Sequence, residues 1–146
     1  MGKTNKILSL DEASKEFHNQ RRYVIKDNTI GTRGYQKIAE LVCTYDDLVH
    51  FFGEPIRLLN HPDRRVEWGF REETNMGSET GVGATIYDDN SGKWIEKDTP
   101  LAEVFNWNVG GSEDRSLEII GQIFQQEMEK GKKFVSKPMD EDEATD

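Results

Sequence analysis

The stretch that decides the fold runs from Val104 to Asp114 and reads VFNWNVGGSED. Phe105, Trp107 and Val109 alternate with other residues, which is typical of a strand with one buried face. A Gly-Gly pair follows, and then Ser112-Glu113-Asp114, which is typical of the first turn of a helix. Phosphate sites are often built in this order, because free backbone N–H groups and the positive end of the helix dipole converge there. The stretch therefore predicts either a cradle for an anion or a tight corner.

Five residues of this stretch are candidate ligand-binding residues: Trp107, Asn108, Gly110, Gly111 and Ser112. A tryptophan face and an asparagine amide suit recognition of a nucleotide base, and the glycines would admit close approach of a ligand. In the alternative interpretation, the glycines only permit positive φ angles at a corner. Glu113 and Asp114 favour the corner, because they already compensate the helix dipole and would repel a phosphate.

The segments before this stretch carry clear signals for a helix and two strands. TYDDLVHFFGEP (44–55) predicts a short helix that Thr44 caps and Gly53 ends. RVEWGF (65–70) and VGATIYD (82–88) alternate apolar and other residues, which predicts half-buried antiparallel strands.

The remaining elements are predicted from weaker patterns. RYVIK (22–26) is rich in β-formers and predicts a strand, whereas residues 35–43 fit a strand or a helix. A capping box at 9–12 predicts a short helix over 10–19, and apolar spacing predicts a long helix over 113–130.

Together these elements predict a single domain of the α+β class, an antiparallel sheet with helices packed on one face. Its expected bounds are 21–135, after an N-terminal segment, 1–20, with a short helix. The last residues, 136–146, form an acidic tail that we expect to be disordered, because it is dense in charge and poor in apolar groups.

Composition limits the classes of function. The 146 residues include 28 acidic and 19 basic ones, a net charge of −9, which argues against direct nucleic-acid binding. This acidic excess either serves solubility or mimics the phosphates of DNA toward a DNA-binding protein. The longest apolar runs are a few residues, so we expect neither a membrane span nor a signal peptide, and a cytoplasmic location.

The candidate reactive groups are few. Cys43 is the single cysteine and is interpreted as a structural thiol rather than a nucleophile. The three histidines lie apart, without the spacing of a zinc site. We predict no catalytic residue, no metal and no cofactor.

Glu67 with Asp88 or Asp89 would bring carboxylates together if their strands pair, as metal-assisted or acid–base hydrolysis needs. The alternative is the solvated outer face of a strand, where these acids contact a partner. Trp94 follows a turn and is a candidate contact residue as well, because tryptophan is enriched at interface hot spots. The candidate partner-binding residues are thus Trp94, Glu67, Asp88 and Asp89.

The motifs TYDDLVHFFGEP, VEWGF, GATIYDD and NWNVGG resemble those of a group of small, uncharacterised proteins of tailed phages and large DNA viruses. The resemblance covers residues 30–125 and implies a viral accessory protein that acts on a host component. Asn108 stands where the group has a histidine, and an asparagine cannot replace its proton transfer. We therefore expect a non-enzymatic protein that binds and modulates a host protein, such as a defence or DNA-processing factor. The alternatives are a nucleotide-binding module and a DNA-mimicking acidic inhibitor.

Overall fold

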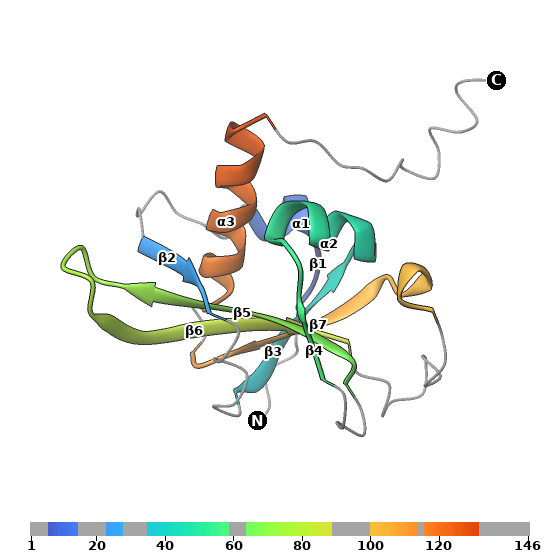
Figure 1. Ribbon diagram of the computed structural model, residues 1–146, viewed down its shortest axis with the longest axis horizontal. Helices are drawn as coiled ribbons and strands as arrows, with labels where there is room; N and C mark the ends of the chain where they lie inside the picture. The colour runs from blue at the N-terminus through green and yellow to red at the C-terminus, as the bar shows by residue number, and fades with distance from the viewer. Residues whose placement is uncertain are drawn as a thin grey trace.

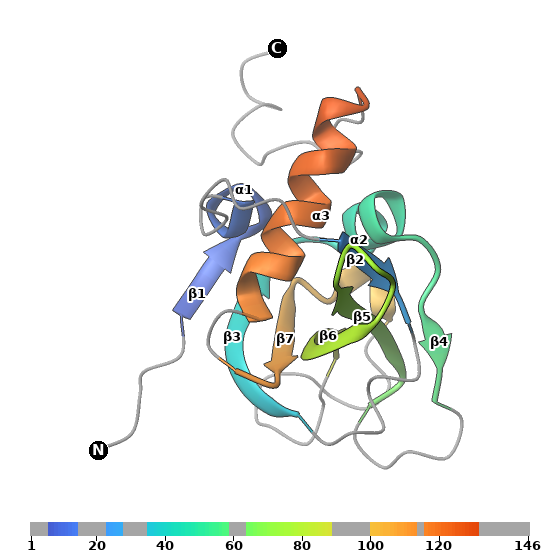
Figure 2. The same cartoon turned by 90° about the vertical axis from the view of Figure 1, so that its left-hand side faces the viewer.

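The computed structural model describes residues 6–14, 23–27, 35–58, 64–88, 100–113 and 116–131. These residues form one domain in which helices cover one face of a seven-stranded sheet (Figures 1 and 2). The predicted α+β class is confirmed. Trp94, Asp89 and the acidic tail lie outside the described residues.

The sheet is built around the quoted stretch. Six strands lie side by side in the order β1 (Lys6–Ser9), β3 (Gln36–Val42), β7 (Asn106–Gly111), β6 (Glu79–Tyr87), β5 (Val66–Glu73) and β2 (Tyr23–Lys26). A seventh, β4 (Ile56–Arg57), pairs with β5. The pair of β1 with β3 is parallel, which makes the sheet mixed, and the other described pairs are antiparallel. The ambiguous segment 35–43 is a strand because it pairs with β7.

The described helices form in the predicted segments, and the last one begins later than predicted. They are α1 (Leu10–Ser14), α2 (Tyr45–Phe52) and α3 (Leu117–Glu129), with a short 3₁₀ turn, η2 (Leu101–Glu103). Ser9 and Glu12 exchange bonds of 2.9 and 3.1 Å between side chain and backbone N–H, which completes the predicted capping box. Thr44 Oγ1 accepts a bond from Asp47 N at 3.1 Å, and Gly53 ends α2 with a φ of 84°.

The N-terminal segment belongs to the domain. β1 is an edge strand of the sheet, and Leu10 and Ala13 of α1 are buried in the common core. The blue α1 packs against the orange α3 (Figure 2). Within the described residues, β1 and α1 therefore belong to the same sheet and core as the later elements.

Two details of the quoted stretch differ from the prediction. Phe105 is 63 % exposed, because β7 begins only at Asn106. The helix begins at Leu117 rather than at Ser112, so the acidic residues before it do not form its first turn. Gly131, with a φ of 97°, follows the end of α3 as predicted.

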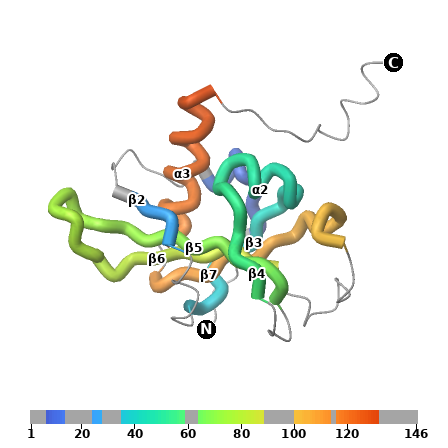
Figure 3. Tube along the Cα trace, viewed as in Figure 1, coloured from blue at the N-terminus to red at the C-terminus, as the bar shows by residue number. Residues whose placement is uncertain are grey.

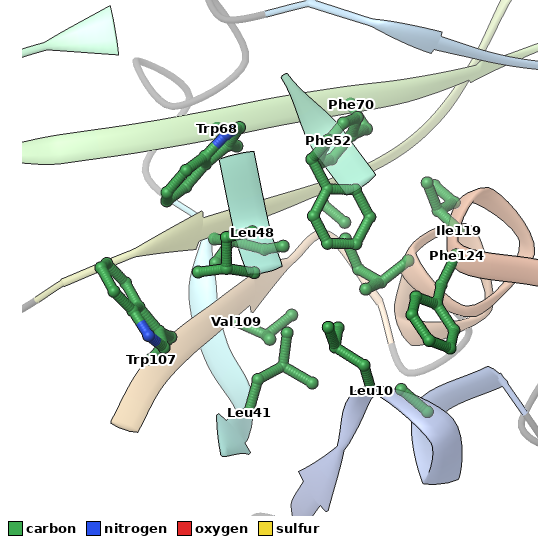
Figure 4. Packing of buried hydrophobic residues seen from close by; sticks show 14 of the residues in the cluster. Leu10, Leu41, Leu48, Phe52, Trp68, Phe70, Trp107, Val109, Ile119 and Phe124 are labelled. Carbon is green, nitrogen blue, oxygen red and sulfur yellow. The ribbon is translucent and has the colours of Figure 1, made fainter. Parts of the chain in front are cut away.

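Two tryptophans hold α2 on the sheet. Trp68 of β5 and Trp107 of β7 are fully buried in the core between sheet and helices (Figure 4). The indole N–H of Trp107 donates to the carbonyl of Cys43, just before α2, at 3.0 Å. That of Trp68 donates to the carbonyl of Gly53, just after α2, at 2.6 Å. The Tyr45 ring lies 6.1 Å from each indole, and the path of the chain around α2 is seen in the Cα trace (Figure 3).

This attachment predicts the effect of removing one indole donor. Trp68→Phe leaves the Gly53 carbonyl without its donor and opens a gap in the core, so we expect a loss of about 3 kcal/mol in the free energy of unfolding. Urea denaturation followed by circular dichroism measures this loss. Phe70→Leu, a change in the same strand that removes no hydrogen bond, is the control. A loss of under about 1 kcal/mol for Trp68→Phe would contradict the attachment.

Candidate functional site

Two backbone donors at the junction between β7 and α3, those of Ser112 and Glu113, are already paired. Ser116 is buried, and its hydroxyl accepts bonds from Ser112 N at 3.1 Å and Glu113 N at 3.2 Å. Ser112 Oγ in turn accepts a bond from Gly83 N at 3.1 Å. An anion at this corner would have to displace Ser116 from both N–H groups. These bonds favour the tight corner over the anion cradle, with Ser116 in the place that an anion would take at these two N–H groups.

The two glycines of this corner are required for close packing. The described glycines with positive φ are Gly53, Gly77, Gly81 and Gly131. The predicted reason for Gly110 and Gly111, a positive φ, is therefore wrong. A Cβ on Gly110 would lie 2.7 Å from Thr85 Oγ1, and one on Gly111 would lie 2.6 Å from Ser116 Cβ. Neighbouring side chains occupy the space that a ligand would have used.

The other candidate ligand residues do not form an open site with the glycines. Trp107 is fully buried and its N–H is bonded to Cys43, so its ring offers no face to a ligand. Asn108 is half-buried and lies between Tyr87 and Glu40 of the neighbouring strands. Ser112 is exposed at the end of the strand.

Asp88 is a structural clasp rather than a solvated acid. It is 0 % exposed, and its Oδ1 accepts bonds from Arg65 N at 2.8 Å and Val66 N at 3.0 Å. Its Oδ2 accepts a bond from Arg65 Nε at 2.8 Å. The carboxylate therefore ties the end of β6 to the start of β5. The outer-face interpretation of Asp88 is wrong, because the strand pairing brings backbone donors to it.

Glu67 is also buried, which corrects the second outer-face assignment. Its carboxylate lies 3.2 Å from Arg64 Nη1, and the Arg64 guanidinium stacks 3.5 Å over the Tyr87 ring. Glu67 pairs across the sheet with Tyr87, which precedes Asp88. The two acids thus each have an arginine partner, and Asp89 lies outside the described residues.

Cys43 has the environment of a structural thiol. Its side chain is half-buried, and it packs against the core beside α2. Burial raises the pKa of the Cys43 thiol far above its ordinary value, and the nearby Asp47 carboxylate raises this pKa further. The thiolate that a nucleophile needs is therefore not formed near neutral pH.

An open groove lies along the outer side of α2. Its volume is about 480 Å³, and it is lined by Tyr45, Asp46, Val49, His50 and Glu54. The first four have the i, i+1, i+4, i+5 spacing of one helix face, and on this face Tyr45 and Val49 also pack against the core. This groove was not identified in the sequence analysis. The i, i+1, i+4, i+5 spacing of its lining residues could have been recognised once the segment 44–55 had been assigned to a helix.

The carboxylates stand at the two ends of this α2 groove. Asp46 in the first turn and Glu54 beyond the helix are exposed, whereas Tyr45, Val49 and His50 are half-buried. Both ends also have a cation nearby. Lys26 Nζ donates to the backbone carbonyl of Glu54 at 2.6 Å, and Arg57 Nη2 donates to Tyr45 Oη at 3.5 Å.

The helices carry charge of one sign. Two acidic residues lie in α1, two in α2 and three in α3, and these helices contain no lysine or arginine. The acidic residues are Asp11, Glu12, Asp46, Asp47, Glu118, Glu127 and Glu129. Asp47 is buried and Glu127 is paired with Lys130. The other five are exposed or half-buried, so they place acidic side chains on the helical face of the domain.

The described residues show neither a metal-binding cluster nor a membrane-spanning helix. Within the described ranges, no three His, Cys, Asp or Glu residues come together as metal ligands. His50 lines the α2 groove, and the other two histidines lie outside the described residues. None of the described helices has the length and apolarity needed to cross a bilayer. Comparison with protein-family models, curated proteins and solved structures finds no match for this chain.

The packing at Gly110 predicts a coupled pair of substitutions. We expect Gly110→Ala to lower the free energy of unfolding by about 2 kcal/mol, because its Cβ meets the Thr85 hydroxyl. In a Thr85→Ala background the same substitution should cost less than about 1 kcal/mol, because the obstructing atom is gone. A denaturation double-mutant cycle measures the coupling. Additive effects would show that Thr85 does not explain the glycine.

The Asp88 clasp predicts a large loss of stability on substitution. Asp88→Ala removes the acceptor of two backbone N–H groups and the carboxylate that pairs with Arg65 Nε, which should cost about 3 kcal/mol. Thermal and urea denaturation measure the change. Glu129→Ala, which removes an exposed acid at the end of α3, is the matched control and should change stability by less than about 1 kcal/mol. Equal effects of the two substitutions would contradict the clasp.

The raised thiol pKa predicts a dependence of stability on pH. Above roughly pH 8.5 the unfolded chain releases the Cys43 proton while the folded chain keeps it. The folded chain then binds more protons than the unfolded chain, so the free energy of unfolding falls as pH rises, by up to about 1.4 kcal/mol per pH unit. Denaturation of wild type and Cys43→Ala from pH 7 to 10.5 measures the two slopes. Identical slopes above pH 9 would contradict the burial of the thiol.

Proposed function

We propose that this protein is a non-enzymatic viral accessory protein that binds and modulates a host protein from the helical side of its sheet. The observation that carries the proposal is the charge of this side, where the three helices carry seven acidic residues, six of them at least partly exposed, and no lysine or arginine. A surface of one sign steers and orients a partner of the opposite sign. The viral origin rests on the resemblance of the four sequence motifs, and the expected place of action is the host cytoplasm.

The attachment of α2 supports a role in recognition. Both flanks of this helix are bonded to buried tryptophans, so the α2 groove is presented by a fixed element. A fixed surface loses little conformational entropy when a partner docks, which favours affinity. The groove supplies the concave centre that interface hot spots require, and the surrounding acids supply a polar rim.

A DNA-mimicking inhibitor is the second candidate function, and the same helical charge favours it. Carboxylates spread over one face present negative charge to a protein that normally receives a phosphate backbone. In this candidate the partner is a DNA-binding protein, and duplex DNA competes for the same surface of the partner.

The proposed function predicts specific and salt-dependent capture of a basic partner. We expect immobilised wild type to retain a stoichiometric protein from lysate of a susceptible host at about 50 mM salt and to release it as the salt is raised. A variant with Asp11→Asn, Asp46→Asn, Glu118→Gln and Glu129→Gln should retain at least fivefold less. Quantitative mass spectrometry of the eluates measures retention.

The same assay includes a control variant and distinguishes the host-protein modulator from the DNA-mimicking inhibitor. A variant with Lys37→Gln and Glu40→Gln, which neutralises an ion pair of the sheet, keeps the net charge and should bind as wild type does. Release of the partner by duplex DNA supports the mimicking inhibitor, whereas no release supports a different host target. Equal retention by wild type and the fourfold variant would contradict the proposed helical surface.

A further inference from the structure

We propose that the α2 groove binds an arginine side chain of the partner protein. This inference rests on the proposed function and names the chemistry of the contact. The groove combines two features that an arginine needs, apolar surface for its methylene stem and carboxylates for its guanidinium. Its volume of about 480 Å³ exceeds what one side chain fills, so the flanking residues of a peptide fit as well.

The middle of the α2 groove suits the stem and the planar group of an arginine. Val49 and the Tyr45 ring are half-buried there, between the exposed acids. A guanidinium stacks on an aromatic face, and the Tyr87 ring of this protein already carries one, from Arg64, at 3.5 Å. The Tyr45 ring is fixed from below by Trp68 and Trp107, so it does not have to be ordered by the partner.

The two acids at the ends of the groove provide the charge. Asp46 and Glu54 are exposed, so neither carboxylate pays a burial cost before the partner arrives. The cations nearby are Lys26, which donates to the backbone carbonyl of Glu54, and Arg57, which donates to the Tyr45 hydroxyl. Burial lowers the pKa of Lys26 and the Glu54 charge opposes this shift. Lys26 therefore attracts the Glu54 carboxylate from one side, and Asp46 is the acid most available to a bidentate arginine.

The test uses the full chain and two peptides of known composition. One is an octapeptide of alternating arginine and glycine, and the other has citrulline, which is isosteric and neutral, in place of each arginine. Each peptide is titrated at about 20 mM salt into the ¹⁵N-labelled protein, and the amide shifts locate and quantify binding. We expect shifts centred on residues 44–54 with the arginine peptide and at least tenfold weaker binding of the citrulline peptide.

Matched double variants separate a built site from diffuse attraction. Asp46→Asn with Glu54→Gln should weaken binding of the arginine peptide at least fivefold. Glu73→Gln with Glu79→Gln removes the same charge from the β5–β6 hairpin, outside the helices, and should change it by less than twofold. Equal weakening by the two variants, shifts spread over α1 and α3, or equal affinity for the citrulline peptide would each overturn the proposal. The citrulline comparison uses the wild-type protein, so it stands even where a variant is unstable.

The same variants distinguish this inference from the proposed function. If only the groove assignment is wrong, the host partner is still captured by wild type and equally by both double variants. If the proposed function is wrong, no stoichiometric partner is captured by any of the three proteins. If capture falls for the variant with Asp46→Asn and Glu54→Gln and not for the control variant, the result supports both the proposed function and the groove assignment.

Discussion

Two indole hydrogen bonds fix α2 to the sheet, and the rest of the structure depends on them. Trp107 reaches the carbonyl before the helix and Trp68 the carbonyl after it, so an eight-residue helix is held at both ends. An isolated helix of this length is unstable in water, and its order must come from such tertiary contacts. The Trp68 and Trp107 rings also fill the core between sheet and helix, where their centroids lie 5.7 Å apart. Burial and hydrogen bonding therefore act at the same two residues.

The sheet side and the helical side of the molecule differ in where their charged residues lie, and this difference bears on function. On the sheet side, Asp88 and Glu67 are buried and each pairs with an arginine. The acidic residues of the helices are at least partly exposed except for Asp47, and the helices contain no lysine or arginine. The α2 groove is the place where this charge meets a concave, partly apolar surface on an element that cannot easily move. That combination is the basis of the recognition role that we propose.

Local patterns in the sequence predicted most helices and strands. The surroundings of the candidate site residues depend on contacts between segments far apart in the sequence, which these patterns do not show. The capping pattern of α2 and the alternation in β5 and β6 depend on neighbouring residues, so they were readable. β1 was not predicted because its four residues make sense only beside β3. Asp88 was predicted to be exposed because the alternation of apolar and polar residues in β6 shows which side chains share a face of the sheet. It does not show that the face with Asp88 is covered, and Asp88 is buried. The glycines at 110 and 111 looked like a turn signal, although their need for small size comes from Thr85 and Ser116, which strand and helix packing bring close.

Hydrogen exchange of the indole N–H groups tests the attachment of α2 most directly. Trp68 and Trp107 should each give an indole signal in a ¹H–¹⁵N spectrum that persists after transfer to D₂O, because both N–H groups are bonded within the core. The account predicts that both exchange only as fast as global unfolding permits, with the same response to added urea. Exchange of either indole at the rate of an exposed tryptophan, while the amides of β6 and β7 stay protected, would contradict it.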